Sequence, residues 1–178
     1  MKSILVTGGC GFIGSHTSLL LLERGYTIFI LDSGINSSRK SIDQIKLILE
    51  KNGIDPKEKI YFFKGDIKNS ADIKEVFKKS FEINKAIQAV IHFAGLKSVG
   101  ESILEPLNYW NNNVLGTISL LKVMEEFNCK NIVFSSSATV YGNSTDDLLK
   151  ETSKICPINP YGSTKLAVEN ILNDIFKE

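Results

Sequence analysis

The sequence predicts an α/β fold in which a parallel sheet is doubly wound with helices. Three observations predict it. Short apolar runs rich in β-branched residues alternate with segments of helical periodicity along the chain. A glycine-rich turn joins the first run to the first helical segment. The runs at 27–31 and 89–94 are almost wholly apolar, which is typical of strands buried on both faces of a parallel sheet.

The first strand is expected at Ser3–Thr7 and the first helix at Phe12–Arg24. The glycines between them are spaced G-x-x-G-x-x-G, at Gly8, Gly11 and Gly14. Such a turn brings backbone close to a pyrophosphate and lets the helix lie close to the strand. The helix N-terminus then faces the anion. The alternative is a glycine-rich turn in an α/β protein that binds no nucleotide.

The second strand, Thr27–Leu31, leads into Asp32, which lies 18 residues after Gly14. This is the place of the acid that binds the adenosine ribose in dinucleotide-binding folds. Its carboxylate accepts hydrogen bonds from both ribose hydroxyls and repels a 2′-phosphate, so NAD is favoured over NADP. Arg39 in the same loop would weaken that preference if it faced the ribose, and a solvated loop charge is the alternative.

The later elements keep the alternation, and the chain ends on a helix after the fifth strand. A doubly wound dinucleotide fold has six strands. Residues 1–178 are therefore expected to form one Rossmann-like domain that lacks its last strand. The expected helices are 40–51, 71–79, 106–127 and 161–176, and the expected strands are 60–64, 89–94 and 131–135.

An acidic and an apolar residue directly follow the third strand. Asp66 could hold an adenine through its exocyclic amine, and Ile67 could pack on its ring face. Alternatively, Asp66 is an acid at a helix N-terminus near Asn69 or Ser70. His92, in the fourth strand, and His16, in the first helix, are both interpreted as core histidines.

Composition excludes several function classes. The 21 basic and 20 acidic residues give a net charge of +1 without a charge block, so nucleic acid and membrane surfaces are not expected partners. Neither a signal peptide nor a membrane span is expected. The three cysteines have no metal-ligand spacing. They indicate free thiols in a reducing compartment, so we expect a cytoplasmic protein without a metal.

Tyr161 and Lys165 are four residues apart and share one helix face. Ser137 lies just beyond the fifth strand. A free tyrosine has a pKa of about 10, and a neighbouring ammonium favours the phenolate form. The phenolate could take a proton from a substrate hydroxyl that Ser137 also binds. The alternative is an ordinary amphipathic helix in which a Y-x-x-x-K spacing occurs by chance.

With these motifs the chain resembles the extended short-chain dehydrogenases/reductases, and among them the N-terminal part of the UDP-glucose 4-epimerase family. The glycine and Tyr/Lys motifs mark only the superfamily. The runs FAGLK (93–97) and SSSATVYG (135–142) are more specific. The resemblance covers the whole chain. Its stretches are VTGGCGFIGSHT (6–17), GDI (65–67), VIHFAGLKSVGES (90–102), NNVLGT (112–117), FSSSATVYG (134–142) and PYGSTK (160–165).

The resemblance implies interconversion of UDP-glucose and UDP-galactose by NAD-mediated oxidation and re-reduction at sugar C4. It implies Tyr161 as the base, Lys165 as its partner, and Ser137, Thr139 and Lys97 as substrate contacts. It also implies a homodimer of the full-length protein. The implied NAD-binding residues are Gly8, Gly11, Phe12, Ile13, Gly14, Asp32, Ser33, Gly34, Ile35, Asn36, Ser37, Asp66, Ile67, Phe93, Ala94, Gly95, Leu96, Lys97, Asn112, Ser137, Tyr161 and Lys165.

Three other interpretations remain. A sugar-nucleotide dehydratase would need an acidic pair after the fifth strand, and Ala138 and Thr139 stand there instead. A non-catalytic NAD-sensing module would be expected to lose Tyr161 or Lys165, and both are present. The third is that this chain binds NAD without activity, because family members carry a C-terminal domain that grips the UDP moiety.

Overall fold

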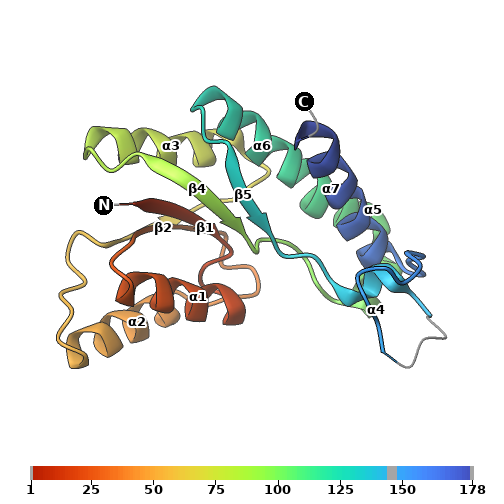
Figure 1. The fold of residues 1–178 in the computed structure, drawn as a ribbon, viewed down its shortest axis with the longest axis horizontal. Helices are drawn as coiled ribbons and strands as arrows, with labels where there is room; N and C mark the ends of the chain where they lie inside the picture. Colours follow the sequence, from red (N-terminus) through yellow and green to blue (C-terminus); the bar gives the residue numbers. More distant parts are fainter. Residues whose placement is uncertain (1, 144–147, 177–178) are drawn as a thin grey trace. The chain divides into compact units, whose positions relative to one another are not determined.

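A computed structural model describes residues 2–143 and 148–176. Its sheet has five parallel strands in the order β3-β2-β1-β4-β5 (Figure 1). This confirms the doubly wound parallel sheet that the sequence predicts. The strands are β1 Ser3–Thr7, β2 Thr27–Asp32, β3 Ile60–Lys64, β4 Ile87–His92 and β5 Asn131–Phe134.

Helices cover both faces of the sheet, because successive side chains of a strand point to opposite faces. Leu5, Phe29 and Leu31 pack with α3 and α6, while Val6, Ile28 and other residues of the opposite face pack with α1 and α2. The helical elements are α1 Phe12–Glu23, α2 Lys40–Lys51, α3 Ser70–Glu82, α4 Val99–Leu104, α5 Pro106–Tyr109, the π-helix η1 Trp110–Leu115, α6 Gly116–Glu126, the 3-10 helix η2 Ala138–Tyr141 and α7 Pro160–Phe176.

The chain divides into two compact units. The first runs to Ala94 and includes Ser119–Ser135, and it holds the whole sheet with α1, α2 and α3. The second comprises Gly95–Ile118 and the chain from Ser136, and it holds α4, α5, η1, η2 and α7.

Two sequence expectations differ from the structure, and one helix was missed. The single helix expected at 106–127 is built from α5, η1 and α6, and the short helix α4 before it was not predicted. His92 is a core histidine as expected, with 1% of its surface exposed. The same expectation for His16 is wrong, because His16 is exposed and its Nδ1 lies 2.8 Å from the carbonyl oxygen of Phe12 on the same helix.

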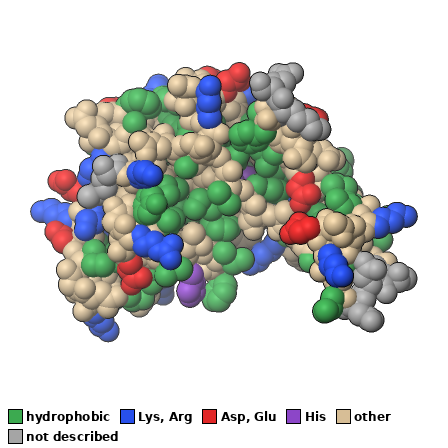
Figure 2. Space-filling model, viewed as in Figure 1, with side chains coloured by type: hydrophobic (Ala, Val, Ile, Leu, Met, Phe, Trp, Pro, Cys, Tyr) green, Lys and Arg blue, Asp and Glu red, His purple; other side chains and the backbone are tan. Residues whose placement is uncertain are grey.

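The described surface carries charges of both signs. On the face shown in Figure 2, positive and negative side chains are interspersed, with hydrophobic side chains between them. Within residues 2–143 and 148–176, no helix is long and apolar enough to cross a membrane. The same residues contain no group of three or more potential metal ligands.

Candidate active site

The glycine turn of the first unit is built for close backbone packing. Gly8 has φ +68° and donates its N–H to the carbonyl of Leu31 at 2.9 Å. A Cβ at Gly8 would lie 2.7 Å from the backbone nitrogen of Ala94, so this position excludes any side chain. Helix α1 begins directly after Gly11 without a side-chain cap at that position. Its first-turn N–H groups therefore have no side-chain cap from Gly11, and the side chains of Phe12 and Ile13 are exposed.

Asp32 connects this turn to the loop after β2. Its Oδ2 accepts the N–H of Cys10 at 2.9 Å, and its Oδ1 accepts the N–H of Gly34 at 2.9 Å and the hydroxyl of Ser37 at 2.6 Å. The carboxylate is 7% exposed. Burial and the neighbouring Asp32 charge raise the pKa of the Cys10 thiol to about 11, so this thiol stays protonated.

The remaining loop residues predicted to hold the ribose lie at the surface. Ile35 is 68% exposed and Asn36 is exposed, while Ser33 is half-buried. The guanidinium of Arg39 lies 5.3 Å from the centre of the Phe62 ring. Arg39 is therefore engaged with an aromatic ring on β3.

The turn after β3 holds a half-buried Asp66 and places Ile67 in the core. Ile67 is 7% exposed and belongs to the cluster packed under α3 and α6. The Oδ1 of Asp66 accepts the N–H of Lys68 at 2.9 Å, and its Oδ2 lies 3.4 Å from the Lys68 ammonium. The N-cap of α3 is Asn69 and the acid in its first turn is Asp72, so Asp66 precedes the helix.

His92 fixes the end of β4. Its Nδ1 lies 2.6 Å from the hydroxyl of Thr7, and that hydroxyl accepts the N–H of Ala94 at 3.3 Å. The N–H of Phe93 donates to the Thr7 carbonyl at 3.1 Å. The buried histidine thus helps position Ala94 through the Thr7 hydroxyl.

In the second unit, Asn113 holds the loop that follows. Its Oδ1 accepts the N–H of Leu96 at 2.8 Å, and its Nδ2 donates to the Leu96 carbonyl at 3.0 Å and to the Thr164 hydroxyl at 3.1 Å. Gly95 has φ +156°, and a Cβ there would lie 3.0 Å from the Asn113 Oδ1. The neighbouring Lys97 is exposed.

The resemblance predicts that Asn112, and not Asn113, binds the cofactor. Asn112 turns its amide to Asn108, one turn earlier, whereas Asn113 is 3% exposed. The π-helical turn η1 contains all three consecutive asparagines, and such turns are frequent at functional sites. The sequence showed the three amides without showing which one is buried, since regular helical spacing does not anticipate a π turn.

Tyr161 and Lys165 lie in the first turns of α7, and both are buried. The Lys165 Nζ is 5.9 Å from the centre of the Tyr161 ring. Burial lowers the pKa of Lys165 to about 8. The Tyr161 ring also meets Tyr109 edge-on, with centroids 6.4 Å apart. Burial and a hydrogen bond to Glu101 raise the pKa of Tyr109 to about 12, so Tyr109 stays protonated beside it.

Ser137 caps the 3-10 helix η2 and accepts two hydrogen bonds at Oγ. The donors are the N–H of Thr139 at 3.3 Å and the hydroxyl of Thr139 at 2.9 Å. Gly162 lets α7 approach this turn, because a Cβ there would lie 2.7 Å from the Thr139 carbonyl. Ser136, next to Ser137, donates a hydrogen bond to Glu169 on α7. The unit therefore brings Ser137, Thr139 and Tyr161 to the start of α7.

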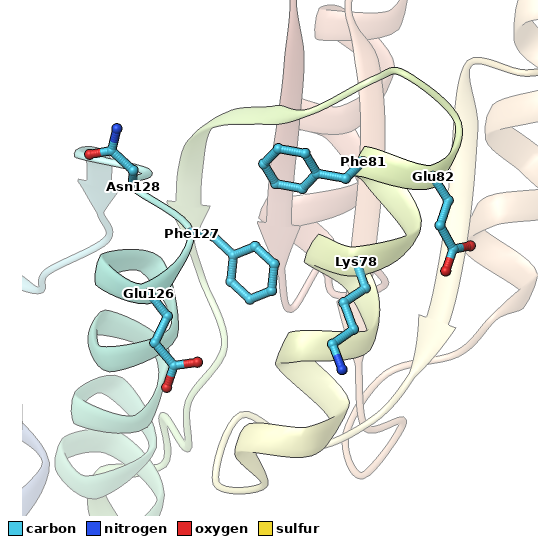
Figure 3. A pocket seen from close by; sticks show the side chains of 6 residues that line it. All are labelled: Lys78, Phe81, Glu82, Glu126, Phe127 and Asn128. Atoms are coloured by element: carbon cyan, nitrogen blue, oxygen red, sulfur yellow. The ribbon is translucent and has the colours of Figure 1, made fainter.

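A hollow elsewhere in the first unit contains none of the predicted site residues. It lies between the ends of α3 and α6, and the rings of Phe81 and Phe127 project into it (Figure 3). Both helix ends lead into the amino ends of β4 and β5. Ligands of doubly wound sheets bind at the carboxyl ends of the strands, so we do not assign this hollow to the cofactor.

The chain is similar in sequence to a known protein family and to curated proteins. A family model described as GDP-mannose 4,6 dehydratase matches residues 5–178. UDP-glucose 4-epimerase 2 of Arabidopsis thaliana is 46% identical over 176 residues, which are 99% of this chain and 48% of that protein. The chain spans about half the length of the curated relatives it matches.

Solved structures agree with the sequence relatives. The UDP-glucose-4-epimerase of Stenotrophomonas maltophila, with bound NAD and formylated UDP-arabinopyranose, gives a TM-score of 0.87 at 40% identity, covering 98% of this chain and 48% of that one. The Bifidobacterium longum enzyme in complex with NAD+ and UDP gives 0.86 at 39% identity, covering 98% and 49%.

Proposed function

Because this chain belongs to the GDP-mannose 4,6 dehydratase family, we propose that it binds NAD and forms the cofactor-binding part of a UDP-glucose 4-epimerase. The names of its relatives and the ligands of its structural neighbours support this reading. The substrate is then a UDP-hexose, interconverted between the gluco and galacto forms at C4.

The residues of the first unit fit NAD. A Cβ at Gly8 would meet the backbone of Ala94, so the turn lies close to the end of β4. The spacing of its glycines suits the close approach of backbone to a pyrophosphate. Asp32 would hold the adenosine ribose, and its buried negative charge disfavours a 2′-phosphate. The turn at Asp66 would hold the adenine. When bound, NAD supplies the hydride acceptor and donor for sugar C4.

The residues of the second unit would move the proton. Tyr161 as phenolate takes the proton from the sugar 4-hydroxyl, and returns it when the 4-keto sugar is reduced. Lys165 would hold its positive charge beside Tyr161, because its Nζ lies 5.9 Å from the centre of the Tyr161 ring. Ser137 accepts both of its intramolecular hydrogen bonds from Thr139, so its own hydrogen is available to the sugar oxygen.

The burial of Lys165 beside Tyr161 is the observation that carries this proposal. A lysine ammonium at 5% exposure is costly to bury, and perturbed groups of this kind cluster at functional sites. Burial lowers the pKa of Lys165 to about 8, which leaves it mostly protonated at neutral pH and close to its titration. A lysine that only stabilised the fold would be expected at the surface.

The test compares Tyr161→Phe with Tyr26→Phe as a control in the first unit. NAD binding is followed by calorimetry and the conversion of UDP-galactose to UDP-glucose by chromatography. Removing a general base costs about 10²–10⁴ in rate, so we expect that loss in Tyr161→Phe with NAD affinity unchanged within about twofold. Full activity of Tyr161→Phe would remove Tyr161 from the mechanism.

The same assay separates the alternatives. NAD binding by the wild type without turnover would support a chain that only binds the cofactor. Release of a 4-keto-6-deoxy sugar would support a dehydratase, although Ser137 is followed by Ala138 and Thr139 and not by an acid.

We further infer that the full-length protein is a homodimer and works in the reducing cytoplasm. Exposed apolar side chains on α4, α5 and η1 of the second unit support the dimer. The free thiols support the compartment. The apolar side chains are Ile103, Leu104, Leu107, Trp110 and Leu115.

A further inference from the structure

A side chain from α3 holds the turn that carries Asp66. The Oδ2 of Asp72 accepts the backbone N–H of Asp66 at 2.8 Å, and its Oδ1 accepts the side-chain N–H of Asn69 at 2.7 Å. Asn69 in turn donates its backbone N–H to the Asp66 carbonyl at 2.9 Å and caps α3 by accepting the N–H of Ala71 at 3.1 Å. Both backbone groups of Asp66 are thus tied to the first turn of α3.

Gly65 allows Asp72 to approach the backbone of this turn. Its flexible backbone also means that the turn needs a contact to hold it in place. A Cβ at Gly65 would lie 2.8 Å from the Cβ of Asp72 and 2.9 Å from the Cδ1 of Leu31, so only glycine admits the aspartate so close. Glycine also leaves the peptide plane between Gly65 and Asp66 with few steric restraints. The hydrogen bond to Asp72 fixes that plane, and with it the direction in which the Asp66 side chain leaves the backbone.

We propose that Asp72 is a positioning residue that determines specificity for the adenine end of the dinucleotide. It holds the Asp66 carboxylate where it can accept the 6-amino group of adenine. A purine with a carbonyl at that position presents an acceptor to the carboxylate and is rejected. The inference rests on the proposed NAD function, and it concerns a residue that touches Asp66 and not the ligand.

The test exploits the donor and acceptor pattern between Asn69 and Asp72. In Asp72→Asn the side chain keeps its size, but one of its two acceptor atoms becomes a donor that faces another donor. In the double variant Asn69→Asp with Asp72→Asn the two roles are exchanged. Asp at 69 still caps α3 and now accepts from Asn at 72, whose oxygen still accepts the Asp66 N–H. Net charge is the same as in the wild type.

The probes are NAD and nicotinamide hypoxanthine dinucleotide, with calorimetric dissociation constants for the 178-residue chain. A lost charged hydrogen bond at the turn should weaken NAD binding about tenfold and the hypoxanthine analogue by less than about twofold. The exchange variant should recover the wild-type preference for NAD. Asp43→Asn, which removes an exposed acid from the first turn of α2, should change neither constant.

A merely structural role would weaken both dinucleotides equally, and an unchanged ratio in Asp72→Asn would overturn the inference while leaving NAD binding in place. Failure of the wild type to bind either dinucleotide would overturn the proposed function as well. Asp72→Glu keeps the charge but displaces the carboxylate, so it gives the same test if Asp72→Asn folds poorly. A wild-type ratio in Asp72→Glu would contradict the proposal.

Discussion

The side-chain amide of Asn113 pairs with both backbone polar groups of Leu96, at 2.8 Å and 3.0 Å. One asparagine therefore makes with Leu96 the two hydrogen bonds that a residue of a strand would make with a neighbouring strand. The same amide donates to Thr164 on α7, three residues after Tyr161. Asn113 thus joins the predicted cofactor loop to the helix that carries the predicted base.

Asn113→Ala should lower the free energy of unfolding by about 2 kcal/mol, because it leaves the half-buried backbone groups of Leu96 without their partner. Asn112→Ala is the matched control, since the side-chain amide of Asn112 bonds to Asn108, one helical turn earlier. We expect a change of less than about 0.5 kcal/mol there. Urea unfolding followed by circular dichroism gives both values, and equal values would contradict the role of Asn113.

Asp32→Ala should weaken NAD binding and relax the discrimination against NADP. The variant removes the anion that repels a 2′-phosphate, and we expect the ratio of the two affinities to fall about tenfold. Asp55→Ala is the control, because Asp55 is an exposed loop acid that bonds to the N–H of Lys57. Calorimetry with both cofactors measures the ratio. An unchanged preference would exclude Asp32 from the ribose site.

Lys165 predicts a pH dependence of stability. Its pKa is lowered from 10.5 to about 8, so between these values the unfolded chain binds more protons than the folded one. The free energy of unfolding should therefore rise with pH across this window, by an amount on the order of 3 kcal/mol from this group. Below pH 8 Lys165 is protonated in the folded chain as well, so the full free-energy cost of burying its ammonium is present.

Lys165→Met isolates that contribution. The variant should lack the rise between pH 8 and pH 10.5 that the wild type shows, and should be the more stable protein below it. Urea unfolding of both proteins across the window measures the difference. Parallel curves would mean that Lys165 is not desolvated in the folded chain.

If the full-length protein is a dimer, a charge placed in its interface should lower its molecular mass in solution to that of a monomer. Leu107 is 82% exposed on α5, and Leu107→Asp would place a charge in an apolar interface. We expect a dimeric full-length protein to become monomeric in light scattering after chromatography. Leu47→Asp on α2, where Leu47 is 49% exposed, should leave the mass unchanged. A wild type that runs as a monomer would contradict the dimer itself.

The strands and the sheet were predictable because their signals are local. Runs such as Ile28–Ile30 are apolar on both faces, and glycines mark their ends, so periodicity located all five strands within a few residues. The sequence failed to predict the elements whose local structure is decided by tertiary contacts. The π turn at Asn113 and the short helix α4 depend on packing in the second unit, and regular spacing carries no sign of either.

Two side chains show the same limit. His16 looked like a core residue by type, but its position on α1 faces solvent. Asp72 received no role from the sequence, because it is one acid among several charged residues in the segment that forms α3. Its contact with the Asp66 N–H depends on the close approach that Gly65 allows, and that approach is visible only in three dimensions.

The most direct test of the account is cofactor binding by the 178-residue chain. The purified chain is denatured and the supernatant assayed for NAD, and its thermal unfolding is recorded with added NAD and NADP. A ligand at about 100 times its dissociation constant adds about 2.7 kcal/mol of stability. We predict retained NAD, or stabilisation by NAD and not by NADP. No NAD and no stabilisation would contradict the claim that these residues form a dinucleotide site.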